Sequence, residues 1–193
     1  MHINRELSYK VENISDQEIL NLLKADHTFE KGFRWLMGKY QERLYWHIRR
    51  MVVDHEDAND VIQNTFIKAW KGLDNFRADS KLYTWLYRIA TNESITFINK
   101  RKKQRSEDLE SEEAYQHNSY LVADDYFDGS EAEKKLYEAL ETLPDKQRAV
   151  FQLRYFEDMK YDDISEVTGT SVGGLKASYH HAVKKIEQYI LEG

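Results

Sequence analysis

The hydrophobic pattern of the first hundred residues predicts consecutive amphipathic helices. Apolar side chains recur at steps of three and four residues, which places them on one face of a helix. Ser15-x-x-Glu18 is a capping box and predicts the start of the first helix, because each side chain can satisfy a free backbone N–H group. Later stripes run through residues 33–52, 58–70 and 85–98. We expect the third of these helices to open at Asp57, and Phe66, Trp70 and Trp85 to lie in the core.

The second half of the chain shows the same periodicity after an interruption. Residues 104–130 lose the apolar repeat and are rich in Ser, Asp and Glu, which predicts a flexible acidic linker. The repeat resumes in residues 131–193. The single proline, Pro144, is expected in the first turn of a helix, where an N–H group has no intrahelical partner to lose.

The sharpest local pattern lies near the C-terminal end. A short apolar repeat in residues 161–167 predicts one helix, and a longer repeat in residues 172–190 predicts a second. Gly169, between them, suits a turn that requires a positive φ. A helix, a glycine turn and a longer helix with cationic side chains form the pattern of a helix-turn-helix, which binds DNA. An ordinary helical hairpin with a solvated face fits the spacing equally well.

Composition narrows the fold class. The 193 residues include one proline, eight glycines and no cysteine, which leaves few turn residues for a β-sandwich or a doubly wound sheet and excludes disulfides and thiolate chemistry. Nothing resembles a signal peptide, and no apolar stretch approaches the ~20 residues of a membrane helix. We expect an all-α, cytoplasmic protein with two small helical domains, residues 1–103 and 131–193, joined by the flexible acidic linker 104–130, the second domain containing a helix-turn-helix.

The net charge of −6 hides an uneven distribution along the chain. Residues 1–103 have a net charge of +4, residues 104–130 of −7 and residues 131–193 of −3. Within the first domain, residues 88–105 contain six basic side chains and one acid. A cationic track with aromatic rings suits single-stranded DNA, because unpaired bases stack while phosphates are neutralised. The alternative is that the lysine run solvates a helix end and the aromatic rings fill the core.

The motifs of common enzyme classes are missing from the sequence. It contains no Gly-rich phosphate loop, no G-x-S-x-G and no H-E-x-x-H. His180 and His181 are adjacent, so on a helix they diverge by about 100° and cannot easily share a metal ion. We therefore expect no enzymatic activity, no cofactor and no metal site.

Four motifs, in order along the chain, resemble those of the extracytoplasmic-function (ECF) class of bacterial RNA polymerase sigma factors. The resemblance covers roughly residues 26–190. Residues 57–66 (DANDVIQNTF) are similar to region 2.2, which binds core polymerase, and residues 85–92 (WLYRIATN) to regions 2.3 and 2.4, which open and read the minus-10 element. Residues 143–157 are similar to region 4.1, and residues 161–185 to region 4.2, which reads the minus-35 element.

The resemblance implies three interaction surfaces. The surface expected to bind core polymerase comprises Asp60, Gln63 and Asn64. The surface expected to bind minus-10 DNA comprises Tyr83, Tyr87, Arg88, Asn92, Lys100, Arg101, Lys102 and Lys103. The surface expected to bind minus-35 DNA comprises Ser171, Lys176, Ser178, His180, His181 and Lys184. Without the resemblance, the first set would be read as a solvated helix face.

The chain departs from the family pattern at a few positions. Asn64 stands where the family often has glutamate, so one polar contact with the polymerase core can differ. Ser178, His181 and Val183 stand where arginines are common in the recognition helix. We therefore expect weaker phosphate attraction from that helix, or a different promoter sequence.

Together these observations predict a transcription initiation factor. The expected partners are the RNA polymerase core, promoter DNA and an anti-sigma factor. The free protein is expected to be a monomer that does not insert into membranes and associates with the bacterial nucleoid through polymerase. Two alternatives remain open at this stage: a helix-turn-helix regulator that binds operators as a dimer, and a helical adaptor that binds only proteins.

Overall fold

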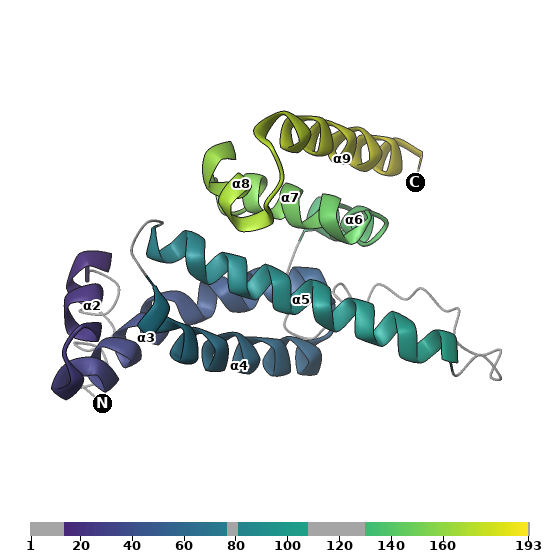
Figure 1. Cartoon of the computed structure of the whole chain (residues 1–193). Helices are drawn as coiled ribbons and strands as arrows, with labels where there is room; N and C mark the ends of the chain where they lie inside the picture. Colours follow the sequence, from purple (N-terminus) through teal and green to yellow (C-terminus); the bar gives the residue numbers. More distant parts are fainter. Residues whose placement is uncertain (1–13, 77–80, 108–129, 193) are drawn as a thin grey trace.

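The computed structural model describes residues 14–76, 81–107 and 130–192, and in these ranges the regular structure is entirely helical. The elements are α2 (Asp16–Leu23), α3 (Asp26–Val52), α4 (His55–Gly72), the 3₁₀ turn η1 (Leu73–Asn75), α5 (Leu82–Glu107), α6 (Glu131–Glu141), α7 (Asp145–Tyr155), α8 (Tyr161–Thr168) and α9 (Val172–Glu192). Figure 1 shows two groups of helices, which we call the first lobe (α2–α5) and the second lobe (α6–α9). In the described ranges no helix is both long and apolar enough to span a bilayer.

Capping residues set where the helices of the first lobe begin. The predicted capping box at the start of α2 is confirmed: Ser15 Oγ accepts from the Glu18 backbone N–H at 3.2 Å, and Glu18 accepts from the Ser15 N–H at 2.9 Å. Helix α4 begins at His55, before the predicted start at Asp57, because the Asp54 carboxylate accepts from the Asp57 N–H at 3.0 Å. That acceptor satisfies an N–H group that the helix itself leaves free.

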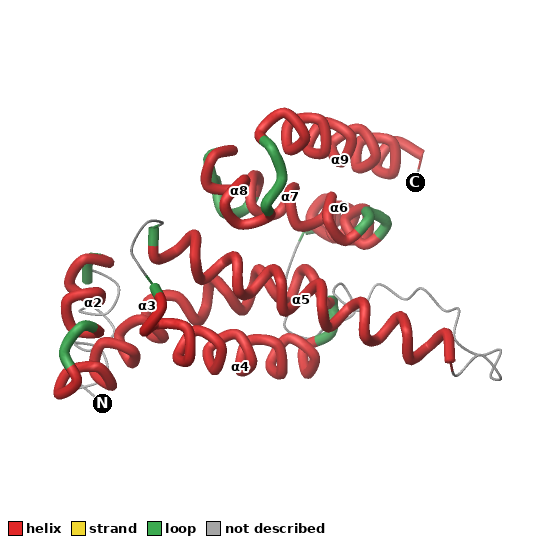
Figure 2. Tube along the Cα trace, viewed as in Figure 1, coloured by secondary structure: helices red, strands yellow, loops and turns green. Residues whose placement is uncertain are grey.

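The first lobe is a bundle of three long helices, α3, α4 and α5, with α2 packed at one end of α3 (Figure 2). The predicted apolar stripes face one another inside this bundle, and Leu36, Ile48 and Leu86 are fully buried. Phe66 is buried as expected, but Trp70 retains 42% exposure, so its assignment to the core was wrong. Its ring lies in the last turn of α4 and packs edge-on against aromatic rings of α3 at the margin of the core.

The second lobe confirms the predicted helix-turn-helix. Pro144 precedes the first turn of α7 as its N-cap, one position before the expected one. Gly169 ends α8 with φ +68°, the conformation expected of it, and its N–H donates to the Ser165 carbonyl at 2.8 Å. In α9, Leu175 and Ala182 are buried. Ile190 is 39% exposed, because the apolar stripe extends to the C-terminal end of α9, beyond the buried part of the helix.

The two lobes are packed against each other in this structure. Helix α8 lies against α5, and α7 contacts α3 and α5 (Figures 1 and 2). One hydrophobic cluster runs through both lobes and includes Leu86 and Ala90 of α5 with Leu153 and Ile164 of α7 and α8. Helix α5 continues to Glu107, past the expected start of the acidic linker. Residues 108–129, most of that linker, lie outside the described residues.

Candidate nucleic-acid interface

The polar residues predicted on α4 share one side of that helix. Asp60, Gln63 and Asn64 are exposed, whereas Val61 and Ile62 beside them are buried. This alternation follows from the helical period, because residues three and four apart lie on the same face. The structure therefore brings the three side chains together at the surface of the first lobe, on the side of α4 that faces away from the hydrophobic core.

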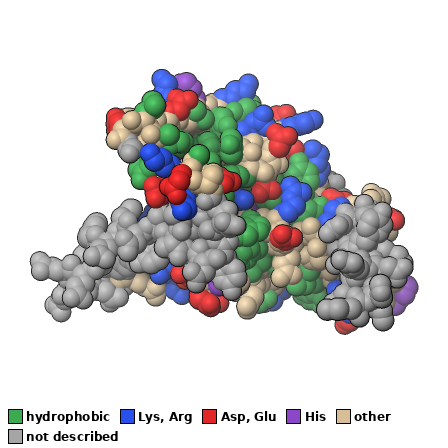
Figure 3. Space-filling model, turned by 180° about the vertical axis from the view of Figure 1, so that it is seen from behind, with side chains coloured by type: hydrophobic (Ala, Val, Ile, Leu, Met, Phe, Trp, Pro, Cys, Tyr) green, Lys and Arg blue, Asp and Glu red, His purple; other side chains and the backbone are tan. Residues whose placement is uncertain are grey.

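The outer face of α9 presents most of the residues predicted to contact duplex DNA. Its exposed members are Lys176, His180, His181 and Lys184. Ser178 is half-buried, and Ser171 is a capping residue whose Oγ accepts from the Gly174 N–H at 3.3 Å. The Lys176 amine lies 5.8 Å from the centre of the Tyr161 ring, a cation–π contact that joins the two helices of the motif. Figure 3 shows Lys, Arg and His side chains gathered at the top of the molecule, over this lobe.

Helix α5 exposes most of the polar and cationic residues predicted on it. Its exposed members are Arg88 and Asn92 in the N-terminal half and Lys100, Lys102 and Lys103 in the C-terminal half. Arg101 differs, because it is half-buried and pairs with the Asp57 carboxylate on α4. The Lys102 amine donates to the Asp145 carboxylate of α7 at 2.6 Å, so this lysine already bridges the lobes.

The N-terminal half of α5 is covered by the second lobe. Tyr87 is fully buried, and its hydroxyl donates to the Glu157 carboxylate. The half-buried Tyr83 donates its hydroxyl to the Asp163 carboxylate. Both tyrosines were predicted to contact minus-10 DNA, but in this arrangement neither ring is free to stack on a base. The sequence pattern did not show that another part of the chain covers them.

Asp163 sits at the centre of one interlobe contact. The Lys81 amine donates to its two carboxylate oxygens at 2.9 and 3.2 Å, beside the hydrogen bond from Tyr83. Burial alone would raise the pKa of Asp163, but the hydrogen bonds from Tyr83 and Lys81 outweigh it and lower that pKa below its ordinary value. Burial and the same carboxylate raise the pKa of Tyr83. The contact therefore favours a charged carboxylate and a neutral, donating hydroxyl.

Glu157 forms the second interlobe contact. Arg43 lies 3.2 Å and Arg50 3.8 Å from its carboxylate oxygens, both from α3, and Tyr87 donates from α5. The Arg50 guanidinium also lies 4.2 Å from the centre of the Phe156 ring. Burial, the negative charge of Glu157 and the hydrogen bond to it raise the pKa of Tyr87 well above its usual range. One carboxylate of the second lobe thus holds three side chains of the first.

Two further polar residues of α7, Arg148 and Gln152, are buried on the face of that helix from which Arg148 reaches α3. Arg148 donates to the Met51 carbonyl of α3 at 2.9 Å and to the Glu141 carbonyl at 2.8 Å. Gln152, one turn further on, is fully buried, and neither amide atom has a hydrogen-bond partner among the described residues. A buried unsatisfied polar group costs about 1–3 kcal/mol. The unsatisfied amide of Gln152 therefore adds a free-energy cost to the closed arrangement, in which the two lobes are packed against each other.

Sequence reasoning missed the carboxylates that join the lobes. The sequence pattern assigns no contact to Asp163, and Glu157 is only the last residue of the motif in residues 143–157. Their partners lie 70 to 114 positions away along the chain. No periodicity connects such distant positions, so no local signal in the sequence could have paired them.

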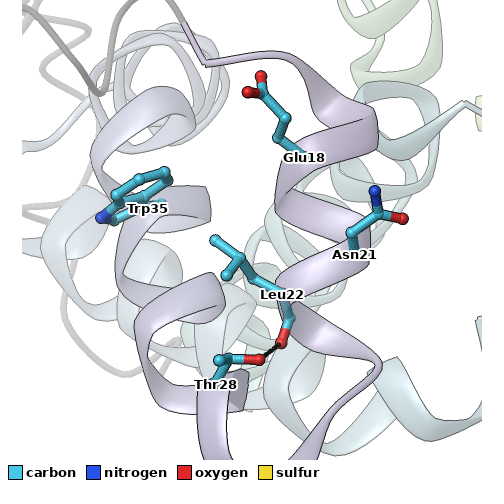
Figure 4. A pocket seen from close by; sticks show the side chains of 5 residues that line it. All are labelled: Glu18, Asn21, Leu22, Thr28 and Trp35. Atoms are coloured by element: carbon cyan, nitrogen blue, oxygen red, sulfur yellow. Dashed lines mark hydrogen bonds between the residues drawn. The ribbon is translucent and has the colours of Figure 1, made fainter.

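A surface hollow of about 410 Å³ lies away from these residues, between α2 and α3. Figure 4 shows Glu18, Asn21 and Leu22 of α2 facing Thr28 and Trp35 of α3 across it, with the Thr28 hydroxyl donating to the Leu22 carbonyl at 2.7 Å. Its one carboxylate already caps α2. Among the described residues, no three His, Cys, Asp or Glu side chains are grouped as metal ligands.

Comparison with known families and proteins identifies both lobes. Sigma-70 region 2 matches residues 36–104, and Sigma-70, region 4 matches residues 133–186. The RNA polymerase sigma-H factor of Pseudomonas aeruginosa is 31% identical over 190 residues, covering 90% of this chain and 92% of that protein. The ECF RNA polymerase sigma-E factor of Haemophilus influenzae is 29% identical, covering 93% of this chain and 97% of that protein.

Solved structures agree with these assignments. The sigma factor RpoE of Bartonella quintana, determined with the anti-sigma factor NepR, aligns with a TM-score of 0.66 at 25% identity, over 83% of this chain and 97% of that chain. CnrH, determined with the cytosolic domain of CnrY, aligns with a TM-score of 0.67 at 22% identity, over 91% of this chain and 96% of that one, and shows the shared fold. The order of the two regions, the sequence identity and the helical architecture all agree: the chain belongs to the extracytoplasmic-function family of RNA polymerase sigma factors.

Proposed function

We propose that this protein binds the RNA polymerase core and directs promoter-specific initiation, with the first lobe acting on minus-10 DNA and the second on minus-35 DNA. The observation that carries the proposal is the order of the matches, region 2 in residues 36–104 and region 4 in residues 133–186, on helical lobes with separate polar faces. Relatives that this chain matches over nine-tenths of its length are named as sigma factors.

The polar face of α4 is the proposed contact with core polymerase. Asp60, Gln63 and Asn64 are exposed together, so a partner can reach all three at once. Asp60 supplies a carboxylate, and the two amides supply both donors and acceptors. Such a face suits a polar, partly cationic helix surface on the polymerase. Ile67, 51% exposed on the same helix, adds an apolar contact.

The exposed face of α9 is the proposed reader of the minus-35 duplex. A helix of this width fits the major groove, and the second helix of a helix-turn-helix is the one that enters it. Lys176 and Lys184 stand two turns apart and can neutralise phosphates, while His180 between them can donate to a phosphate or a base edge. Ser171 acts indirectly, because its side chain caps α9, the helix that carries these residues.

The cationic face of α5 is the proposed site for the minus-10 strand. Arg88 and Asn92 are exposed one turn apart, and the run from Lys100 to Lys103 continues the same helix. Cations along a helix can follow the phosphates of a single strand while aromatic rings stack on its bases. Tyr83 and Tyr87 can take that second role only when the second lobe moves away from α5.

Two further statements belong to the proposal. The protein performs no chemistry itself and acts in the bacterial cytoplasm, where polymerase and the chromosome are found. It also has an anti-sigma partner, which is supported by RpoE of Bartonella quintana, a sigma factor whose structure was determined with its anti-sigma factor.

Run-off transcription tests the proposal. Purified bacterial core polymerase is incubated with genomic fragments, with and without this protein, and transcript 5′ ends are mapped. We expect new start sites that share one minus-35 and one minus-10 sequence at fixed spacing. Transcripts with the same start sites and yields in both reactions would contradict the proposal. Specific binding of a palindromic duplex by the free protein, without any effect on polymerase, would favour the operator-binding alternative.

A further inference from the structure

The ion pairs between the lobes have a consistent direction, although Arg148 of the second lobe also donates to the Met51 carbonyl of the first. Three carboxylates of the second lobe accept from cations and hydroxyl groups of the first. These pairs are Asp163 with Lys81 and Tyr83, Glu157 with Arg43, Arg50 and Tyr87, and Asp145 with Lys102. These carboxylates therefore present negative charge to the cationic and aromatic side chains of the first lobe, on the side where the second lobe lies over α5 (Figure 1).

This is the same chemistry that a single DNA strand would present to that face. A carboxylate and a phosphate are both anions that accept from ammonium, guanidinium and hydroxyl donors. Tyr83, Tyr87 and Lys102 belong to the proposed minus-10 surface, and each is held by a carboxylate of the second lobe. With Tyr87 fully buried, its ring has no face left for a base. A strand bound through these tyrosines and the closed second lobe exclude each other.

The same contacts leave the closed arrangement open to competition. Three of the four cationic partners are largely exposed: the Arg43, Lys81 and Lys102 side chains retain 58%, 59% and 63% of their accessible surface, whereas Arg50 retains 15% and the carboxylates retain 7% to 17%. Because one member of each of these three pairs is in contact with water, salt weakens the pairs by screening. The buried amide of Gln152 lacks hydrogen-bond partners among the described residues, and it regains water when the lobes part.

We propose that the second lobe masks the single-strand DNA face of the first through a carboxylate latch, Glu157 and Asp163, and that DNA must displace this latch. The inference rests on the proposed function only in naming the minus-10 strand as the competitor. The closing of the two lobes is itself a property of the free chain. The latch keeps the free protein from capturing single-stranded DNA with its tyrosines, and separation of the lobes exposes them.

The latch is tested on the full-length chain with paired variants. Because the protein has no cysteine, Lys71→Cys on α4 and Glu187→Cys on α9 accept fluorophores whose energy transfer reports lobe separation. Glu157→Gln with Asp163→Asn removes the two charges. The matched control, Asp158→Asn with Glu166→Gln, makes the same charge change at exposed acids of the second lobe, which form no hydrogen bond or ion pair with the described residues of the first.

We expect the latch variant to lose energy transfer and to bind a fluorescent single-stranded minus-10 oligonucleotide about tenfold more tightly than the control. A variant in the opposite direction, Gln152→Leu, removes the unsatisfied amide and should raise energy transfer and weaken binding. The proposal is overturned if the latch variant equals the control in either measurement, or if Gln152→Leu opens the lobes. Neither measurement uses polymerase. A failure of the proposed function, seen as absence of promoter-specific transcription, can therefore be distinguished from a failure of the latch proposal.

Discussion

The two helices proposed to read DNA, α5 and α9, differ in what faces them. The exposed side of α9 carries Lys176 and Lys184, and none of the helices in the described ranges covers these two side chains. The corresponding half of α5 lies beneath α8, and its Tyr87 is fully buried. The difference shows that a polar or aromatic face on a helix is not by itself an accessible one. In this arrangement the second lobe can approach duplex DNA while the first lobe cannot use its tyrosines.

The largest expected effect follows from removing cations on the open helix. Lys176→Ala with Lys184→Ala should weaken binding of minus-35 duplex DNA about 60-fold at 0.1 M salt, because each phosphate contact contributes about 0.9 to the salt slope. The slope itself should become shallower by about 1.8. Fluorescence anisotropy titrations at several salt concentrations measure both quantities.

Lys185→Ala is the matched control for that variant, because it removes the same charge from α9 about 100° further around the helix. Its affinity should stay close to that of the unchanged protein. The double variant removes two charges and Lys185→Ala removes one. If the loss of binding free energy per charge is the same in both, α9 attracts DNA through its net charge alone and has no specific DNA-binding face.

The second-largest expected effect is a loss of stability at low pH, which we attribute to a buried histidine of the first lobe and not to the exposed histidines of α9. His47 is fully buried, with Nε2 2.9 Å from the Thr91 hydroxyl, and burial with the nearby Arg50 lowers its pKa to about 3. The folded state keeps His47 neutral while the unfolded chain takes up a proton below about pH 6.5, so stability is lost as the pH falls. Between pH 6.5 and 5.0 the loss should be about 2 kcal/mol of unfolding free energy.

Urea denaturation at the two pH values measures this loss. In His47→Gln, which has no titrating group at that position, the decrease over this range should disappear. His181→Gln, an exposed histidine of α9, should retain it. Carboxylates with lowered pKa values, such as Asp163, destabilise the fold only at lower pH and do not enter this window. An unchanged pH dependence in His47→Gln would show that another group is responsible.

The smallest expected effect concerns the polar face of α4, which is exposed like that of α9 but is proposed to bind a protein. Asp60→Ala with Gln63→Ala should weaken core-polymerase binding about tenfold, since a hydrogen bond contributes about 0.5–1.5 kcal/mol. Exposed substitutions usually change stability by no more than about 0.5 kcal/mol, so the fold should persist. Glu30→Ala, an exposed acid on the neighbouring α3, is the control. Equal affinities of the two variants in a fluorescence titration would remove α4 from the polymerase contact.

The sequence by itself determined the local structure and the family of this protein. Ser15 and Glu18 predicted the start of α2, and Gly169 predicted the turn between α8 and α9, because both depend on backbone groups within a few residues. The apolar repeats predicted which side of each helix is buried. Trp70 shows the limit of that reasoning, since a residue on the apolar stripe can still lie at the edge of the core.

Only the tertiary structure decided which of the exposed-looking faces are covered. Tyr83 and Tyr87 follow the pattern of a DNA-binding surface, yet Asp163 and Glu157 from the second lobe hold both hydroxyls. The physical reason is that helix formation depends on neighbours three or four residues apart, whereas the packing of the two lobes depends on side chains 43 to 114 positions apart. Charge and shape across that contact are properties of the folded surface, which no local repeat encodes.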